Sequence, residues 1–529
     1  MLRRLLTIGL ALLFLNASLT FRNLWPTPGI AWHGDLSIEL AVSLIALAVL
    51  RTRRSPPASM SLRSLSVLWT TLVIGRYAEV TAPALYGRDI NLYWDLRFIP
   101  DVVRMVVRVA PIWIIVASLA GAVSALVLFY WIVSMAWRVV AAACADPRMR
   151  RGLIGLSTLS LFVWAGRAAV GRSPFEPPFA RPVALTYARQ AAFVAESVAG
   201  SSQIGASPAL SSDLSRVGAA DVFLVFVESY GAVCFDRPDI AERLADARRR
   251  LEAAVERTNR HAVSAYVESP TFGGSSWLAH LSLMSGVEVR DQRMNAQLMT
   301  ERRDTLVRAF GRRGFRTVAL MPGLRQSWPE GTFYGFDDIY GAERLGYRGP
   351  EFGWFSIPDQ YSLERLDELE EARREHVPRF VFFPTLSTHF PFSPTPPYQP
   401  DWARVSTARP FDGPAIVRAY ARQPDWMNFA PGYIDALSYE LATFAGYLLK
   451  HGDRDLVMIL VGDHQPPALV SGQGASWDVP VHVIANRTAI LDRLATHGFR
   501  PGLMPERPSL GRMPALLPVL LDSFGNPES

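Results

Sequence analysis

The first third of the chain is dominated by long apolar stretches. Five lie within residues 1–172: Leu5–Thr20, Leu36–Leu50, Leu65–Tyr86, Pro111–Ala143 and Leu153–Val170. Each approaches the length of about 20 residues that a helix needs to cross a bilayer, although the second needs tilt or local thinning of the membrane. We therefore predict an N-terminal transmembrane domain of about five helices over residues 1–172.

The arginines near these stretches indicate an orientation. They precede the first, third and fifth stretches: Arg3, Arg4, Arg51, Arg53, Arg54, Arg63, Arg148, Arg150 and Arg151. By the positive-inside rule these segments are cytoplasmic, and five spans then place the C-terminal part outside. A signal peptide also starts with basic and apolar residues, but residues 16–20 offer no small-x-small cleavage site, which favours an uncleaved anchor. We predict a multi-pass protein of the plasma (inner) membrane with a periplasmic C-terminal domain.

Composition narrows the class of protein. A chain of 529 residues that is 50% hydrophobic and 19% charged is neither disordered nor typical of a wholly soluble enzyme. The net charge of +6 is too small and too dispersed to indicate a nucleic-acid partner. Two cysteines, Cys144 and Cys234, exclude a disulfide framework, and the predicted topology places them on opposite sides of the membrane.

Two further segments of the N-terminal part carry expectations. Arg76 and Glu79 lie inside the third stretch at i, i+3 spacing, so we expect them to pair or to lie near the outer surface. Residues 173–220 are rich in Pro, Ala and Ser, with one predicted helix at Val183–Val198. This composition indicates a linker.

From Asp221 to the C-terminus, short apolar runs alternate with helical patterns. The runs at 221–227, 316–321, 379–383 and 456–461 are typical of strands buried on both faces, and helices are predicted near 240–262, 303–314, 363–376 and 433–451. This alternation predicts an α/β sandwich with a mostly parallel central sheet over residues 221–529. Active sites of such sheets lie at the carboxyl ends of the strands.

Polar residues follow two of these strands. Glu228 comes directly after the first run, and Asp463-His464 follow the run at 456–461. Two carboxylates and an imidazole suit Zn²⁺ or Mn²⁺. We expect one or two such ions.

The loop at 268–280 could supply a further ligand for this predicted metal site and a nucleophile for catalysis. Two glycines are followed by Ser275 and Ser276 and then by an apolar helical pattern. A hydroxyl at a helix N-terminus is favourably placed to become an alkoxide and to meet a phosphate, although a plain N-cap serine gives the same pattern. A further imidazole, His389, follows the strand at 379–383 and would be unremarkable alone.

Together these residues resemble the alkaline phosphatase and sulfatase superfamily, most of all its membrane-anchored branch of lipoteichoic acid synthases, phosphoethanolamine transferases and phosphoglycerol transferases. The resemblance extends along essentially the whole chain. It rests on Glu228 after the first strand, on Gly462-Asp463-His464 and on the segment Thr388–Phe392. It implies five N-terminal spans, a linker and an extracytoplasmic catalytic domain.

The family spacing also selects a nucleophile. It places the nucleophile ten residues before the Gly of Ser285-Gly286, which is Ser276, while Ser275 and Thr271 remain alternatives. His280 stands four residues on, where the family has Glu or Arg. The Pro and Arg that accompany formylglycine formation in sulfatases are absent after Ser276, so the resemblance implies an unmodified serine.

The resemblance implies roles for the remaining residues. Glu228, Ser276, Asp463 and His464 would hold the metal, with Ser276 as nucleophile. His389, His280, Trp328 and Arg325 would bind the substrate. The expected reaction moves a phospho-headgroup from a membrane phospholipid donor to a glycan acceptor, and the alternatives are a sulfatase-like phosphodiesterase or sulfuric ester hydrolase and a non-catalytic lipid sensor. The oligomeric state is left open.

Overall fold

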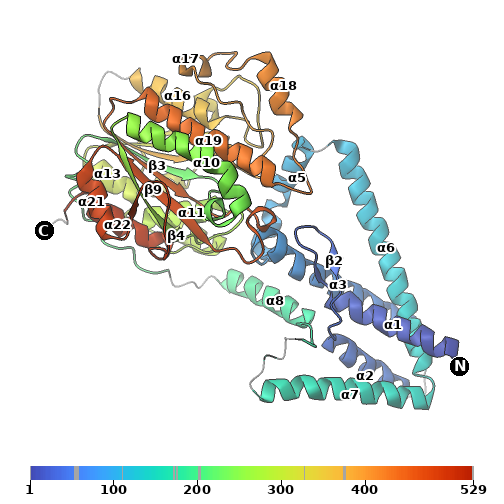
Figure 1. The fold of residues 1–529 in the computed structure, drawn as a ribbon. Coiled ribbons are helices and arrows are strands. Elements are labelled where there is room, and N and C mark those ends of the chain that lie inside the picture. Colours follow the sequence, from blue (N-terminus) through green and yellow to red (C-terminus); the bar gives the residue numbers. More distant parts are fainter. Residues whose placement is uncertain are drawn as a thin grey trace. The chain divides into compact units, whose positions relative to one another are not determined.

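The computed structural model describes residues 2–52, 59–109, 111–170, 173, 177–199, 204–326, 328–372 and 377–526. They form two compact units, Met1–Ser201 and Ser202–Ser529 (Figure 1). The division falls inside the expected linker, with α8 (Val183–Ala199) in the first unit and Leu210 in the core of the second. Arg53, Arg54 and the expected helix end at His376 lie outside the described residues.

The first unit is helical, with one small hairpin. Its further elements are α1 (Leu2–Thr20), β1 (Arg22–Asn23), β2 (Ile30–Ala31), α2 (Ile38–Thr52), α3 (Ser59–Tyr86), α4 (Leu92–Asp95), α5 (Ile99–Val109), α6 (Ile112–Ala143) and α7 (Pro147–Ala169). Each apolar stretch falls on one of α1, α2, α3, α6 and α7. Within the described residues, α1 and α6 are long and apolar enough to cross a membrane. The number of five spans stays a prediction.

Side chains from three helices join the interior of this unit. The indole of Trp69 on α3 meets that of Trp137 on α6 edge-to-face, with ring centroids 5.1 Å apart. The Nε1 atom of Trp69 donates a hydrogen bond of 3.0 Å to Ser18 Oγ on α1. The expected pairing of Arg76 with Glu79 is confirmed, with a nitrogen–oxygen distance of 3.3 Å.

The second unit alternates strands and helices. Its strands are β3 (Asp221–Val227), β4 (His261–Glu268), β5 (Arg316–Met321), β6 (Asp338–Gly341), β7 (Arg379–Pro384), β8 (Leu456–Gly462), β9 (Asp478–Ala485) and β10 (Arg500–Pro501). Its helices are α9 (Val233–Asp236), α10 (Pro238–Arg257), α11 (Ser276–Ser285), α12 (Gln292–Thr300), α13 (Leu306–Arg312), α14 (Gly331–Tyr334), α15 (Ala342–Leu345), α16 (Asp359–Glu371), α17 (Trp402–Val405), α18 (Gly413–Ala421), α19 (Ala430–Lys450), α20 (Ala468–Ser471), α21 (Thr488–Thr496) and α22 (Leu516–Phe524).

One eight-stranded sheet, in the order β10-β4-β9-β8-β3-β7-β5-β6, forms the centre of this unit. The strands from β8 to β6 are parallel, which confirms the predicted α/β class with a mostly parallel sheet. β9, β4 and β10 pair antiparallel and extend the sheet beyond the predicted strands. The helix predicted through Ala262 ends at Arg257, because the chain turns there and enters β4.

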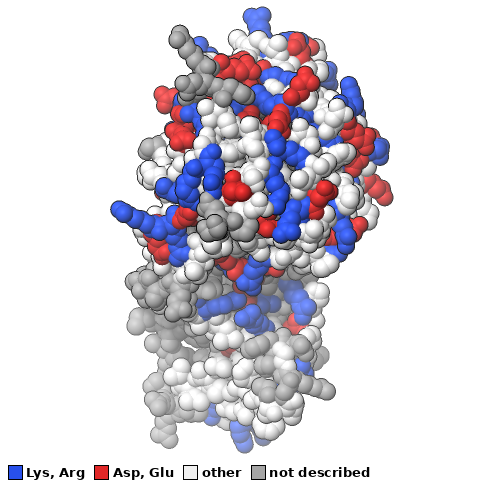
Figure 2. All heavy atoms as spheres, turned by 90° about the vertical axis from the view of Figure 1, so that its left-hand side faces the viewer, with Lys and Arg blue, Asp and Glu red and all other residues white. Residues whose placement is uncertain are grey.

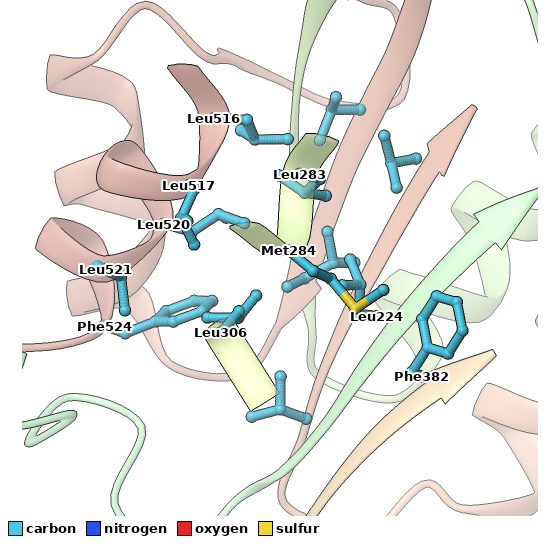
Figure 3. Packing of buried hydrophobic residues seen from close by; sticks show 14 of the residues in the cluster. Leu224, Leu283, Met284, Leu306, Phe382, Leu516, Leu517, Leu520, Leu521 and Phe524 are labelled. Carbon is cyan, nitrogen blue, oxygen red and sulfur yellow. The ribbon is translucent and has the colours of Figure 1, made fainter. Parts of the chain in front are cut away.

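The central strands bury both faces. Along β3, Val222, Leu224 and Phe226 face one hydrophobic cluster, whereas Phe223, Val225 and Val227 face another. Helices α11, α13, α21 and α22 cover the first face, and α10, α16 and α19 cover the second. Figure 3 shows Met284 of α11 beside Leu224, with Leu283 of α11 and Leu306 of α13 on the side towards the α22 residues of the same cluster. Full burial of one such leucine contributes about 1.5–3 kcal/mol, which fixes α11 against the sheet.

Charges on the second unit are locally balanced. The face that carries α13, α21 and α22 is turned to the viewer in Figure 2, where basic and acidic side chains are intermingled. Ion pairs on these helices include Arg493 with Asp522 at 2.6 Å and Arg312 with Asp304 at 2.8 Å. Such exposed pairs contribute at most about 1 kcal/mol each, so the fold depends on the buried core.

Candidate active site

Parallel pairing brings Glu228 and Asp463 to the same edge of the sheet. Val227, the last residue of β3, lies in register with Gly462, the last residue of β8. The next residue of each strand therefore emerges beside the other. Gly462 is needed for this approach, because a Cβ atom there would lie 1.9 Å from the Tyr230 carbonyl oxygen.

Glu228, Asp463 and His464 form a compact buried cluster. Their ligand atoms all lie within 4.8 Å of one another, and the residues are only 6%, 1% and 1% exposed. His464 Nε2 is 3.4 Å from Glu228 Oε1 and 3.7 Å from Asp463 Oδ2. This cluster is the only group of three or more potential metal-ligating side chains among the described residues.

The orientation of His464 fits a divalent cation. Its Nδ1 atom lies 2.7 Å from the carbonyl oxygen of Gln465, which can only accept, so Nδ1 carries a proton. This leaves Nε2, on the side of the carboxylates, available as a ligand, an arrangement common in metal-binding histidines. Asp463 Oδ1 is fixed by the backbone amides of Ser229 and His464 at 2.8 and 2.6 Å, while Oδ2 faces the cluster.

The electrostatics of the cluster also favour a bound cation. Burial opposes ionisation of Glu228, but the attraction of His464 outweighs it and lowers the pKa of Glu228. Burial, and then repulsion by Glu228, raises the pKa of Asp463 well above its ordinary value. The same two carboxylates overcome the burial of His464 and raise its pKa to about 9. Protons thus compensate two buried carboxylates where a metal ion could do so.

Ser276 stands at the edge of this cluster. Its Oγ donates a hydrogen bond of 2.9 Å to Glu228 Oε2 and lies 3.2 Å from His464 Nε2. Ser276 is the first residue of α11. The positive end of the helix dipole therefore lies close to its hydroxyl and stabilises negative charge on the oxygen.

The loop before α11 accounts for the position of Ser276. Gly273, Gly274 and Ser275 all have positive φ angles, of 67°, 143° and 65°. This turn directs Ser276 towards Glu228. The hydroxyl of Thr271 donates to the Gly274 carbonyl at 2.6 Å and is engaged in holding the loop. Ser275, the N-cap, makes no side-chain capping hydrogen bond.

The segment after β7 fixes the backbone of Glu228. Thr385 Oγ1 accepts from the Glu228 amide at 3.1 Å, and Thr388 Oγ1 donates to the Glu228 carbonyl at 2.6 Å. Thr388 lies in the segment Thr388–Phe392 that carries the family resemblance, but neither threonine was predicted as a site residue from the sequence. Their position beside His389 after a buried strand is the signal that could have identified them.

His389 belongs to the same segment and lies near Glu228, where its charge helps to lower the pKa of that carboxyl. Its ring meets Phe355 edge-on, with centroids 5.0 Å apart. Arg325, an exposed residue, donates to the Phe355 carbonyl and to Ser356 Oγ, both at 3.1 Å. Arg325 is thus connected to His389 through the residues at 355–356.

Trp328 lies farther along the segment that follows β5. Its ring lies 5.4 Å from that of Tyr334. Together with Arg325 it lines an open depression of about 640 Å³. Trp328 and Arg325 therefore share one surface.

His280 has a different environment from the other candidates. One turn beyond Ser276, its ring packs 4.5 Å from Phe226 and 5.4 Å from Phe382. Burial lowers the pKa of His280 to about 3 against the attraction of Glu228, so the imidazole is neutral. Its buried Nε2 has no hydrogen-bond partner among the described residues. These contacts place His280 against the core beneath the cluster, where a role in substrate binding stays a prediction.

Residues 278–483 match the Sulfatase family model. The matched region contains the segments that carry His389, Asp463 and His464. This part of the second unit is therefore similar to the Sulfatase family, in agreement with the resemblance seen in the sequence motifs. No curated protein matches the chain in sequence.

Several solved structures are similar to the chain. The integral membrane lipooligosaccharide phosphoethanolamine transferase EptA of Neisseria meningitidis aligns over 98% of this chain and 96% of its own, at 13% identity and a TM-score of 0.49. The lipoteichoic acid synthase LtaP of Listeria monocytogenes aligns over 54% and 69%, at 14% identity and a TM-score of 0.37. The phosphoglycerol transferase GacH of Streptococcus pyogenes aligns over 50% and 69%, at 12% identity and a TM-score of 0.34. The similarity to the Sulfatase family rests on the match to residues 278–483 and not on these structures.

Proposed function

We propose that the chain transfers a phospho-headgroup, of the phosphoethanolamine or phosphoglycerol type, from a membrane phospholipid to an envelope glycan. Glu228, Asp463, His464 and Ser276 would hold one or two divalent ions, Zn²⁺ or Mn²⁺. The main support for this proposal is the position of the Ser276 hydroxyl, which lies at a helix N-terminus within 3.2 Å of a buried carboxylate and imidazole. We place this activity outside the cytoplasm, in a multi-pass protein of the plasma (inner) membrane.

The reaction would proceed in two steps. When bound, the metal supplies a Lewis acid that lowers the pKa of the serine hydroxyl and offsets charge on the phosphoryl oxygens. Ser276 Oγ attacks phosphorus, and its proton passes to the Glu228 carboxylate. The ester bond to diacylglycerol breaks. His389 protonates the departing oxygen. A glycan hydroxyl then gives its proton to His389 and attacks the phosphoserine, the bond between Ser276 and phosphorus breaks, and Ser276 Oγ takes back the proton held by Glu228.

A second function is favoured by the family match itself. Because residues 278–483 match a Sulfatase model, hydrolysis of a phosphodiester or sulfuric ester is the alternative. The two reactions differ in the acceptor, which is a glycan hydroxyl in transfer and water in hydrolysis. The purified full-length protein is therefore incubated with headgroup-labelled phosphatidylethanolamine or phosphatidylglycerol and a glycan extract. Label on glycan supports transfer, whereas label only in free headgroup supports hydrolysis.

The intermediate provides a test at the level of one residue. Mass spectrometry after exposure to phospholipid without acceptor should find the headgroup mass on the peptide that contains Ser276. Ser276→Ala should abolish this adduct and turnover, while the neighbouring Ser275→Ala retains both and Thr271→Ala retains the adduct. An adduct that persists in Ser276→Ala would assign the nucleophile to another residue. A metal-free protein that stays fully active would contradict the mechanism, and one that binds lipid without turnover would support a sensor.

A further inference from the structure

A cavity of about 860 Å³ lies among helices α1, α3 and α6 of the first unit. Ligand pockets commonly have volumes of about 300–1,000 Å³. The lining includes Phe14 and Ala17 of α1, Val73 of α3 and Ala122 and Ala125 of α6. α1 and α6 are the same two helices that qualify as membrane spans among the described residues. In the predicted membrane topology, lipid therefore surrounds the helices that line this cavity.

The lining of the cavity extends along α1 from Phe14 to Phe21. Phe14 of α1 and Phe129 of α6 meet at one end, with ring centroids 5.7 Å apart. Phe21, which directly follows α1, and Tyr77 of α3 lie at the other end of the cavity. The distance from Phe14 to Phe21 along a helix is about 10 Å at about 1.5 Å per residue. The cavity is thus about as deep as two thirds of one leaflet, whose hydrocarbon is about 15 Å thick.

The polar groups that line the cavity are already satisfied within the protein. Ser18 Oγ donates to the Leu15 carbonyl at 2.8 Å and accepts from Trp69 Nε1. Thr70 Oγ1 donates to the Ser66 carbonyl at 2.8 Å. The interior consequently offers an occupant apolar contacts and no free hydroxyl, which suits a hydrocarbon chain and disfavours a headgroup.

Amphipathic aromatic residues lie at the end of the cavity near Phe21. Trp32 is 49% exposed and donates through Nε1 to Thr20 Oγ1, and Tyr77 is 41% exposed and donates to the Pro28 carbonyl. Trp and Tyr gather where a membrane meets water. The ion pair of Arg22 with Asp35, 2.8 Å long, lies in the adjoining hairpin region. This end therefore matches the depth of lipid headgroups.

We infer that the cavity holds one acyl chain of a glycerophospholipid from the outer leaflet, with the headgroup at the level of Trp32 and Tyr77. The leaflet follows from the predicted topology, in which the hairpin after α1 is extracytoplasmic. That this lipid is the donor, or the diacylglycerol that remains after transfer, rests on the proposed function. The binding site itself rests on the cavity and on the predicted membrane spans, and not on the proposed reaction.

Photolabelling of the full-length protein tests the site directly. Phosphatidylethanolamine and phosphatidylglycerol with a diazirine in the middle of one acyl chain are used as probes in vesicles. We expect labelling of the cavity stripe of α6, at Ala122, Ala125 and Leu126, which unlabelled lipid reduces at least fivefold. Labelling of Ala120, on the opposite side of α6, should not saturate, because annular lipid exchanges freely there.

Matched substitutions on α6 sharpen the test. Ala125→Phe should remove the saturable labelling, whereas Ala120→Phe, the same change on the lipid-facing side, should leave it. Ala122→Phe serves as a second blocking variant if Ala125→Phe does not fold. Labelling that fails to saturate, or that is unchanged in both blocking variants, would overturn the proposal, as would an equal loss in Ala120→Phe.

Activity measurements separate this inference from the proposed function. Ala125→Phe should lower turnover of long-chain phospholipid about tenfold and leave a chromogenic phosphodiester without acyl chains unaffected. Equal loss on both substrates would contradict an acyl-chain site. If the unmodified protein turns over neither substrate, the proposed function fails, while saturable photolabelling still decides whether lipid occupies the cavity.

Discussion

Two buried groups of carboxylates in the second unit differ in what surrounds them. Glu228 and Asp463 face an imidazole and the Ser276 hydroxyl. Asp359 and Glu440, also buried, face each other without an imidazole. The first group fits a cation beside a nucleophile. The second is compensated by backbone amides and a proton, so burial of acidic residues alone does not identify a catalytic site.

The second group supports the segment that carries His389. Asp359 accepts from the backbone amides of Leu386 at 2.9 and 3.0 Å and of Ser387 at 2.6 Å. Burial outweighs these hydrogen bonds and raises the pKa of Asp359 to about 6. Burial, and then the charge of Asp359, raises the pKa of Glu440 well above its ordinary value. A proton on Glu440 therefore makes it a donor to Asp359.

The largest expected effect distinguishes these two groups directly. Asp463→Asn should reduce turnover about 10³-fold or more, because it removes a ligand and half of the negative charge that holds the cation. Metal analysis of the purified protein should show loss of stoichiometric Zn or Mn. The matched change Asp359→Asn should retain the metal. Retention of full metal occupancy in Asp463→Asn would show that the two groups of carboxylates do not differ in metal binding.

Metal removal should expose the pH dependence of the first group. The pKa of His464 is raised to about 9 from 6.5, so in chelator-treated protein its stabilising contribution is complete below pH 6.5 and is lost as pH rises through about 9. The loss is of the order of 3 kcal/mol. Thermal unfolding should show a falling Tm over this range. Added Zn²⁺ or Mn²⁺ should restore more stability at pH 8.5 than at pH 6.5, and Asp463→Asn should show no such restoration.

Asp359→Asn should lower the free energy of unfolding by about 1–3 kcal/mol, because it weakens the hydrogen bonds to Leu386 and Ser387. Denaturant unfolding of the metal-loaded protein measures this change. Turnover should fall less than in Asp463→Asn, since the effect reaches the reaction only through the position of His389. A stability equal to that of the unmodified protein would show that the loop is held by its other contacts.

Glu440→Gln should have the smallest effect, of opposite sign. Neither carboxylate oxygen of Glu440 receives a hydrogen bond within the described residues, and a glutamine amide can donate to Asp359 without ionising. Because the folded pKa of Glu440 is raised, its stabilising contribution is complete at low pH and is lost as pH rises above about 4.5. The variant should therefore gain up to about 1 kcal/mol, more at pH 8 than at pH 5. Thermal scans at both pH values measure this gain in stability. A gain that is no larger at pH 8 than at pH 5 would contradict the prediction.

Much of the fold was accessible from periodicity. The apolar runs that became β3, β5, β7 and β8 are buried on both faces, so their sequence carries a strong signal. The antiparallel strands β4 and β9 were not predicted. In β4, Ser264 interrupts the apolar pattern, and it is satisfied only in the folded sheet, where its hydroxyl lies 2.6 Å from His482 Nδ1 on β9.

The candidate site was accessible in part for a related reason. Residues that directly follow buried strands, such as Glu228 and Asp463, are predictable because strand ends meet at one edge of a parallel sheet. The surroundings of His280 and the role of Thr388 depend on contacts between segments far apart in the chain. Helical spacing places His280 beside Ser276, but it contains no information about the aromatic rings of Phe226 and Phe382 that enclose it.

The sequence by itself determined the α/β class of the second unit, the apolar helices of the first, and which side chains stand at the strand ends, because these features are local patterns of polarity. Only the tertiary structure decided which carboxylates share space with an imidazole and a hydroxyl. The register of β3 against β8 and the turn before α11 set those distances. Electrostatic and hydrogen-bonding interactions act over a few ångströms, so the chemistry of each acid follows from its folded neighbours.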